Sequence, residues 1–326
     1  MDRCGRLSPA ILTLSLLAPS QASAQAWVPP KGEGFLSLTF QSLEAGDHLF
    51  SSPVMGERSL DLGSGESRVL VLDGDVGLTD KLGLTLSVAY VDARYTEGGR
   101  AGEIRETLPD FPHLDLPADD GDWHGSLQDA RVSLRYMRPT GSWVLTPGGA
   151  LLVPLRDYRT RGHAATGRGL NEAQLGLDAG RLLDVRGRPR AYLQGGYRYT
   201  FIEELAGISM NRSDLYVELG YLAHPRLTLR GFGDWRTSHG GLDFAAGDLH
   251  GGNFSHHDAL EASEWLRVGV GASVPITRDA DLFASVGHMI AGENIQRSTT
   301  FSAGTTWGFQ APGFGRTKIR FPEPGD

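Results

Sequence analysis

Residues 82–90 read Leu-Gly-Leu-Thr-Leu-Ser-Val-Ala-Tyr, and they alternate large apolar side chains with small or polar ones. Successive residues of a β-strand point to opposite faces, so a pattern that repeats every two residues puts one kind of side chain on each face, whereas a helix would mix the two kinds. The stretch therefore predicts an amphipathic strand. The turn formers Thr79-Asp80-Lys81 come directly before it and predict a tight connection to a preceding strand.

Blocks of this kind continue in both directions, and about twelve follow Trp27. The others are 36–41, 69–78, 129–136, a less regular block at 143–155, 173–180, 191–201, 215–221, 227–236, 266–274, 282–290 and 296–309. The connections alternate in length. Short ones rich in turn formers lie at 79–81, 139–142, 184–189, 223–226 and 275–280, and longer ones at 43–66, 96–126, 156–172, 202–213, 238–263 and 291–295.

This alternation of short and long connections is typical of outer-membrane barrels, which have tight periplasmic turns and longer outer loops. We therefore expect an all-β fold, a transmembrane antiparallel up-and-down β-barrel of about twelve strands. An even number of strands would return both chain ends to the periplasm.

Composition supports this fold class and narrows the possible functions. Glycine contributes 44 of 326 residues, charged residues 21% and hydrophobic residues 40%, which suits many short strands and turns and excludes a disordered chain. The formal net charge of -8, without a long run of Lys and Arg, argues against nucleic acid as a partner. No stretch of about 18 apolar residues follows the N-terminus, so no helical span is expected.

The N-terminus has the pattern of a secretory signal. Arg3 and Arg6 precede the short apolar run 10–18, and the small residues Ala22-Ser23-Ala24 offer a cleavage site. The mature chain would begin near Gln25, although cleavage two residues later is almost as good. We expect a signal peptide over 1–24, a periplasmic segment over 25–34, a barrel over 35–309 and a periplasmic tail over 310–326.

The single cysteine, Cys4, lies ahead of the apolar run and would leave with the signal peptide. The exported protein would then have neither disulfides nor thiolate metal sites. The predicted location is the outer membrane of a Gram-negative bacterium.

Periodicity alone does not decide whether the apolar faces point into a core or outward into lipid. One face carries charges, while the other is uncharged over long runs and has aromatic residues near the block ends, as an interfacial girdle would. These aromatics are Phe40, Tyr90, Tyr136, Tyr199, Phe201, Tyr221, Trp235 and Phe309. A membrane barrel is the favoured interpretation. A soluble sandwich, with the aromatics capping its core, is the alternative.

The charged face supplies the candidate functional residues, because charges that line a lumen set its field and selectivity. The candidates are Asp73, Asp75, Asp129, Arg131, Arg135, Asp178, Arg198, Glu218, Arg230, Asp234, Arg236 and Arg267. Their alternative role is mutual pairing that fills the barrel interior. A plug formed by 25–34 or by an inward-folded long loop is compatible with both roles.

Three short motifs resemble known outer-membrane proteins. The start AWVPPKGEG at 26–34 with the strand FLSL at 35–38, and the hairpin GLTDKLGLTLSV at 77–88, resemble proteins of the meta-pathway of phenol degradation family. That resemblance implies a transporter-like barrel with aromatic or hydrophobic solutes as presumed cargo. The strand FSAGTTWGF at 301–309 resembles the aromatic-ended strand that barrel assembly machinery recognises, although here further residues follow it.

Two loops hold residues that could bind cations. The loop 238–263 contains His239, His250, His256 and His257 with Asp243, Asp248 and Asp258, at spacings too irregular for a metal motif. Acidic residues of the second long loop could bind divalent cations that bridge lipopolysaccharide; they include Asp110, Asp115, Asp119, Asp120 and Asp122. Solvation accounts for both groups more simply, and we predict neither a metal site nor a cofactor.

An outer-membrane enzyme, such as a lipid hydrolase, is the second hypothesis. The only neighbouring pairs are His124 with Ser126 and His288 with Ser285, and neither has an acid partner at a persuasive spacing. A structural or adhesive barrel is the third. The favoured function is a non-enzymatic channel or transporter in the outer membrane, where it would contact lipid and lipopolysaccharide and let small, aromatic or hydrophobic solutes pass.

Overall fold

The computed structural model describes residues 26–54, 56–98, 119–158, 160, 162–184, 189–243 and 260–311. The described residues form fifteen antiparallel strands in one sheet. They are β1 (Glu33–Val54), β2 (Glu57–Leu60), β3 (Gly63–Gly77), β4 (Leu82–Glu97), β5 (His124–Leu127), β6 (Asp129–Tyr136), β7 (Arg138–Thr140), β8 (Trp143–Pro154), β9 (Glu172–Asp184), β10 (Pro189–Ile202), β11 (Met210–His224), β12 (Leu227–Gly240), β13 (Glu264–Pro275), β14 (Ala280–Glu293) and β15 (Ile295–Gln310).

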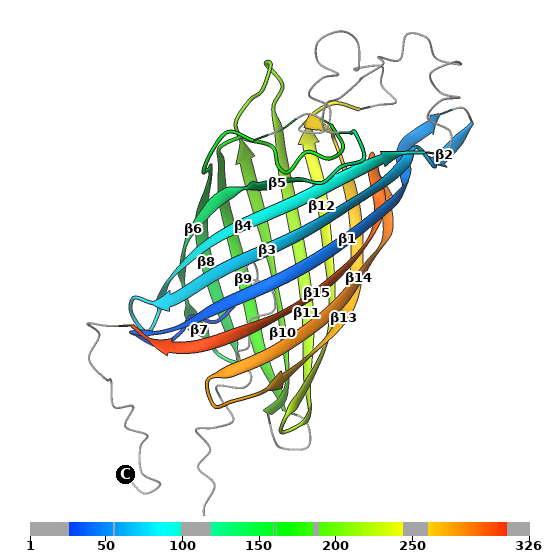
Figure 1. The fold of residues 1–326 in the computed structure, drawn as a ribbon. Coiled ribbons are helices and arrows are strands. Elements are labelled where there is room, and N and C mark those ends of the chain that lie inside the picture. Colours follow the sequence, from blue (N-terminus) through cyan, green and yellow to red (C-terminus); the bar gives the residue numbers. More distant parts are fainter. Residues whose placement is uncertain are drawn as a thin grey trace, which may run out of the picture.

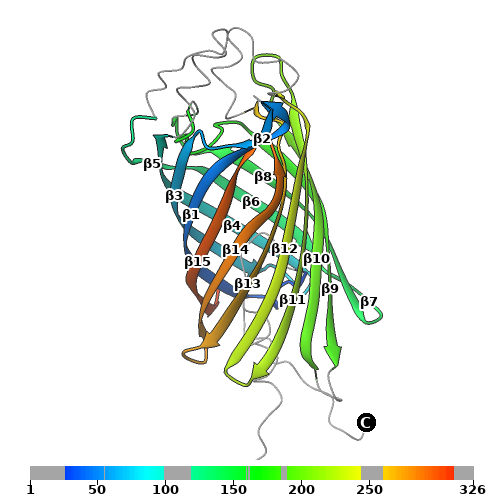
Figure 2. The same ribbon diagram turned by 90° about the vertical axis from the view of Figure 1, so that its right-hand side faces the viewer.

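The sheet closes on itself because β15 pairs with β1 from Glu33↔Gln310 to Leu49↔Ile295. Of the three shortest strands, β2 folds back on β1, β5 continues the line of β6, and β7 extends the hairpin to β8. The remaining twelve strands form the barrel wall. Each pairs with its neighbour in sequence, which is the predicted up-and-down topology, and all of them tilt relative to the barrel axis (Figures 1 and 2).

The two ends of the barrel differ in their connections. The short turns and the C-terminal end of β15 lie at the lower end in Figure 1, which we call the short-turn end. The strand ends that the longer connections join lie at the upper end, which we call the long-loop end. The predicted short turns at 79–81, 223–226 and 275–280 join consecutive strands, and the turn predicted at 139–142 is narrower, because β7 extends to Thr140. Most of the turn predicted at 184–189 lies outside the described residues.

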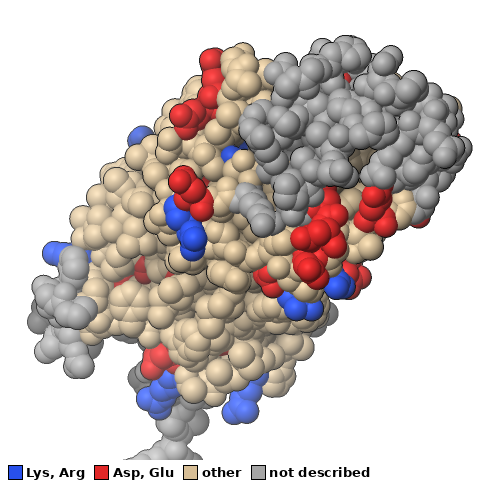
Figure 3. All heavy atoms as spheres, turned by 45° about the horizontal axis from the view of Figure 1, so that its top comes forward, with Lys and Arg blue, Asp and Glu red and all other residues tan. Residues whose placement is uncertain are grey.

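The side chains have the inside-out arrangement of a membrane barrel. Leu86, Leu175 and Val270 point outward and are 51%, 63% and 61% exposed, whereas the inward-facing Thr146 and Thr200 are fully buried. The wall seen in Figure 3 is largely uncharged, with acidic side chains gathered beside the long-loop end. An apolar surface that surrounds a polar interior suits lipid and not water, so the soluble sandwich is excluded. Among the described residues, no helix is long and apolar enough to cross a membrane.

Three predicted connections were wrong. The segment 43–66 is mostly strand, since β1 continues to Val54 and β2 precedes Gly63. Its sequence lacks simple alternation because this part extends beyond the apolar wall, where neither face has to meet lipid. The connection 202–213 shrinks to 203–209. The connection 291–295 is Asn294 alone, whose φ of 51° suits an asparagine better than most residues.

Candidate functional site: the charged lumen

Inward-facing charges on adjacent strands, or on strands one apart, form ion pairs along the inner face of the wall. Because residues two apart on a strand share a face, inward positions on paired strands lie close together. The closest pairs join Arg135 to Asp75 at 2.7 Å, Arg198 to Asp178 at 2.8 Å, Arg212 to Glu172 at 2.7 Å, Arg236 to Asp214 at 2.6 Å and Arg267 to Asp234 at 2.9 Å. Such pairing lets a barrel interior hold many charges away from bulk water.

Two arginines are less well compensated. Arg230 lies 3.9 Å from Glu218, and its Nε has no hydrogen-bond partner among the described residues. Arg131 donates a hydrogen bond to the neutral side chain of Gln174 at 3.1 Å and has no carboxylate within 4.0 Å in the described part of the chain. Positive charge therefore faces the lumen at these two positions.

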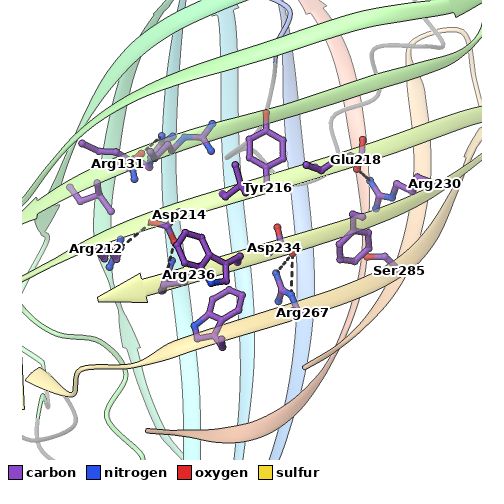
Figure 4. Close-up of a pocket in the computed structure, with 18 residues that line it drawn as sticks. Arg131, Arg212, Asp214, Tyr216, Glu218, Arg230, Asp234, Arg236, Arg267 and Ser285 are labelled. Carbon is purple, nitrogen blue, oxygen red and sulfur yellow. Dashed lines mark hydrogen bonds and ion pairs between the residues drawn. The ribbon is translucent and has the colours of Figure 1, made fainter. Parts of the chain in front are cut away.

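A cavity of about 280 Å³ lies among these groups (Figure 4). Six arginines and three acids line it, and they are Arg131, Arg198, Arg212, Arg230, Arg236, Arg267, Asp214, Glu218 and Asp234. Aromatic rings complete the lining. The guanidinium groups of Arg236 and Arg267 lie 5.2 and 5.7 Å from the ring of Trp265, close enough for cation–π attraction.

The segment 26–32 runs inside the short-turn end of the barrel. Ala26 is fully buried; its N–H donates to Gln194 of β10 at 3.4 Å, and its carbonyl accepts a hydrogen bond from Thr146 of β8. The carbonyl of Trp27 accepts a long hydrogen bond from Arg135, and the Trp27 ring meets the edge of Tyr192. We call residues 26–32 the N-terminal plug, since they contact the wall on several sides.

Glycines in the wall make room for the N-terminal plug. A Cβ at Gly180 would lie 2.6 Å from the Cβ of Ala26, and one at Gly83 would lie 3.0 Å from Val28. At Gly77 it would lie 2.2 Å from the carbonyl oxygen of Pro29. Only glycine permits so close an approach, so the glycines at these three wall positions allow the plug to lie against the wall.

A second segment folds inward at the long-loop end. In the connection between β8 and β9, Tyr158 donates a hydrogen bond to Asp129, and Arg168 lies 3.8 Å from Glu172. Ala164 is fully buried and packs against Tyr95, whose side chain points inward from β4. The described part of 158–170 therefore narrows the outer mouth. Burial also lowers the pKa of Arg168 to about 10, because it penalises the charged form.

Asp119 ties this segment to the connection between β4 and β5. Its carboxylate accepts hydrogen bonds from the backbone N–H groups of His163 and Ala164, at 3.1 and 3.0 Å, and lies 2.8 Å from the His163 ring. Burial alone would raise the pKa of Asp119, but these contacts outweigh it and hold the pKa below its usual value. The carboxylate is therefore charged at neutral pH.

A comparison with solved structures finds the same architecture in an outer-membrane channel from Pseudomonas putida F1, with a TM-score of 0.62 and 12% identity over 89% of this chain and 100% of that chain. The NanC porin follows with a TM-score of 0.46 and 10% identity over 83% of this chain and 98% of its own. A mutant of the TodX monoaromatic hydrocarbon channel has a TM-score of 0.43 and 12% identity over 86% and 91%.

No family model and no curated protein matches this chain. The similarity to the Pseudomonas channel shows a shared fold, because 12% identity is too low to transfer a function. The resemblance to the phenol meta-pathway family stays a prediction.

The structure places the twelve predicted site residues on inward-facing positions of the strands. Ten of them belong to the ion pairs above or line the cavity. Of the other two, Asp73 lies on β3 and Asp129 accepts a hydrogen bond from Tyr158. Whether they set selectivity stays a prediction.

The sequence reasoning missed three charged residues of the site: Glu172, Arg212 and Asp214. The sequence predicted that the strands now called β9 and β11 begin at 173 and 215, which assigned these three residues to loops. They lie an even number of residues from Asp178 or Glu218 on the same strand, so they face the lumen as well. Extending each alternating block until its charge pattern breaks would have found them. It also missed Trp265, one residue before the predicted start of its strand.

The predicted hydrolase pairs do not form a nucleophile and base. Ser285 is buried on the inward face, whereas His288 is exposed on the outer face and contacts Thr299 at 2.9 Å. The Ser126 hydroxyl donates to the carbonyl of Leu127, and the His124 ring lies 2.8 Å from Asp120. Ser126 thus donates to a backbone carbonyl, and Ser285 and His288 lie on opposite faces of the wall, so neither of these arrangements activates a serine as a nucleophile.

Several of the loop residues considered above for cation binding lie outside the described residues, namely Asp110, Asp115, Asp248, His250, His256, His257 and Asp258. Of the others, His239 lies 2.7 Å from the hydroxyl of Ser213, and Asp243 accepts from Ser51 and Asn294. Among the described residues no cluster of His, Cys, Asp and Glu could hold a metal ion. The signal peptide over 1–24 and the tail beyond 311 also lie outside them.

Proposed function

We propose that this chain is an outer-membrane channel for the passive passage of small solutes, exported with a signal peptide over 1–24. One observation carries the proposal: a hydrophilic, charged cavity lies inside a wall whose outer face is apolar. A barrel that served only as a structural scaffold could fill its interior with packed side chains. The shared fold with an outer-membrane channel supports the proposal.

The N-terminal plug and the segment 158–170 restrict this channel at opposite ends. If the short-turn end faces the periplasm, as in other outer-membrane barrels, the plug closes the inner mouth. The plug is joined to the wall by separate hydrogen bonds and by the isolated β-bridge Lys31↔Gly77, not by a continuous strand ladder, and we propose that it moves aside when solutes pass.

The solutes are small because the cavity between the two restrictions is small. The family resemblance extends the proposal to aromatic solutes, and the rings of Tyr216, Phe232 and Trp265 in the cavity lining would give them apolar contact. Lipid surrounds the wall. Lipopolysaccharide contact at the long-loop end stays a prediction.

Planar-bilayer recording of the purified, folded barrel tests the proposal. We expect ion current, and in a KCl gradient we expect the double change Arg131→Gln and Arg230→Gln to move the reversal potential toward cation selectivity, since two lumen cations are lost. The matched control is Arg138→Gln, an exposed position on β7. A folded barrel that carries no ion current and takes up no solute would instead indicate a structural or adhesive role.

A further inference from the structure

The arrangement around Arg131 holds a guanidinium ready for an anion. Its partner Gln174 is fixed, because the Gln174 amide nitrogen donates to the fully buried Thr200 at 3.1 Å while the amide oxygen accepts from Arg131. The amide orients the guanidinium without neutralising it. The other N–H groups of Arg131 have no hydrogen-bond partner among the described residues, so a planar carboxylate could bind them in the bidentate geometry that arginine favours.

The charged residues around Arg131 act on it at longer range than a close ion pair. Asp73 and Asp178 attract it, and Arg135 and Arg198 repel it. Arg135 is paired with Asp75 and Arg198 with Asp178, so these four charges largely offset one another, and Asp73 is the acid left to attract Arg131. Asp73 forms no ion pair with Arg131 within 4.0 Å in the described part of the chain, so the guanidinium borders the cavity without a carboxylate in direct contact.

Arg230 gives a second and independent indication. It is 8% exposed, it lines the same cavity, and its buried Nε has no hydrogen-bond partner among the described residues. Its neighbour Glu218 already accepts hydrogen bonds from Tyr192 and Gln194 on one carboxylate oxygen, and the other oxygen stays 3.9 Å away. A buried donor of this kind is costly unless a ligand or water satisfies it.

From these observations we propose that the lumen cavity binds a small organic carboxylate, with Arg131 as its main ligand-binding cation. Arg230 adds positive potential, and the ring of Tyr216 contacts the apolar body of the ligand (Figure 4). The rings of Phe232 and Trp265, which line the same cavity, add to this contact. A volume of about 280 Å³ lies near the lower end for ligand pockets and limits the site to small molecules. The proposal deepens the proposed channel function and rests on it for the route by which the carboxylate arrives.

Isothermal titration of the full-length barrel in detergent tests the site with three single-ring probes of similar size: benzoate, benzyl alcohol and benzylamine. We expect benzoate to bind at least about tenfold more tightly than the other two. Loss of a charge-assisted hydrogen bond in Arg131→Gln should weaken benzoate binding about tenfold or more. Arg131→Lys keeps the charge but loses the two parallel N–H donors of the guanidinium, so its affinity for benzoate should lie between those of the wild type and Arg131→Gln. The affinity of Arg138→Gln should match that of the wild type.

Equal affinities for the three probes would overturn the proposal, because apolar contact alone would then explain binding. Tighter binding of benzylamine, or unchanged benzoate binding by Arg131→Gln, would overturn it too. Circular dichroism and heat-modifiable gel migration confirm that each variant is folded.

Titration in detergent requires no transport, so the two proposals fail separately. Benzoate binding by a barrel that carries no current would support the site and refute the channel, whereas current without benzoate binding would refute the site alone.

Discussion

Replacing Thr146 with valine should loosen the N-terminal plug. The hydroxyl of Thr146 donates to the carbonyl of Ala26, and both residues are fully buried. Valine has the same shape but no donor, so the carbonyl would lose its partner while the plug is seated. Leaving a buried acceptor unsatisfied costs about 1–3 kcal/mol. The ratio of displaced to seated plug should therefore rise about 5- to 140-fold.

Single-channel recording measures this ratio as the time spent in the state of higher conductance. We expect Thr146→Val to lengthen that time, and Gly180→Val to do so more strongly, because its Cβ would collide with Ala26 and Trp27. The matched control is Thr306→Val, a buried inward threonine of β15 whose hydroxyl pairs with Ser37 and not with the plug.

The reasoning is refuted if both plug variants conduct like the wild type and like Thr306→Val. The plug would then not be the element that restricts the lumen, or it would stay seated through contacts other than those described.

Three further predictions follow from the wall and the loops. Arg135→Met should destabilise the barrel by about 3–5 kcal/mol in urea titrations, because Asp75 would be left buried without its ion-pair partner; removing both charges together should restore most of the loss. Val270→Arg, which places a charge on the outer face, should cost about 2–4 kcal/mol of folding free energy in lipid vesicles and much less if that face is not in lipid. The pKa of Asp119 lies below its usual value of 3.8, so its contact with the His163 backbone should persist at neutral pH and be lost as the pH falls through that lowered value; hydrogen exchange at residues 163 and 164, corrected for the intrinsic rate, should show this, and Asp119→Asn should lose the protection at neutral pH.

Much of the architecture follows from local alternation. A period of two fixes which side chains share a face, so the block at 82–90 already separated Leu86 from Thr85, and the charged residues from Asp73 to Arg267 fell on one face. The number of strands and the short turns followed from the same pattern. Strand ends were less accurate where the wall leaves the membrane, because β1 beyond Leu43 no longer has to alternate.

The sequence by itself therefore determined the strands, their faces and the charges that an interior would have to hold, since these depend on neighbours along the chain. Only the tertiary structure decided that the apolar face looks outward, that β15 meets β1, and that Arg135 pairs with Asp75, while Arg131 has no carboxylate within 4.0 Å among the residues described. It also seated Ala26 against Thr146, 120 residues away. Such contacts arise from closure of the barrel, which brings together positions that no local pattern relates.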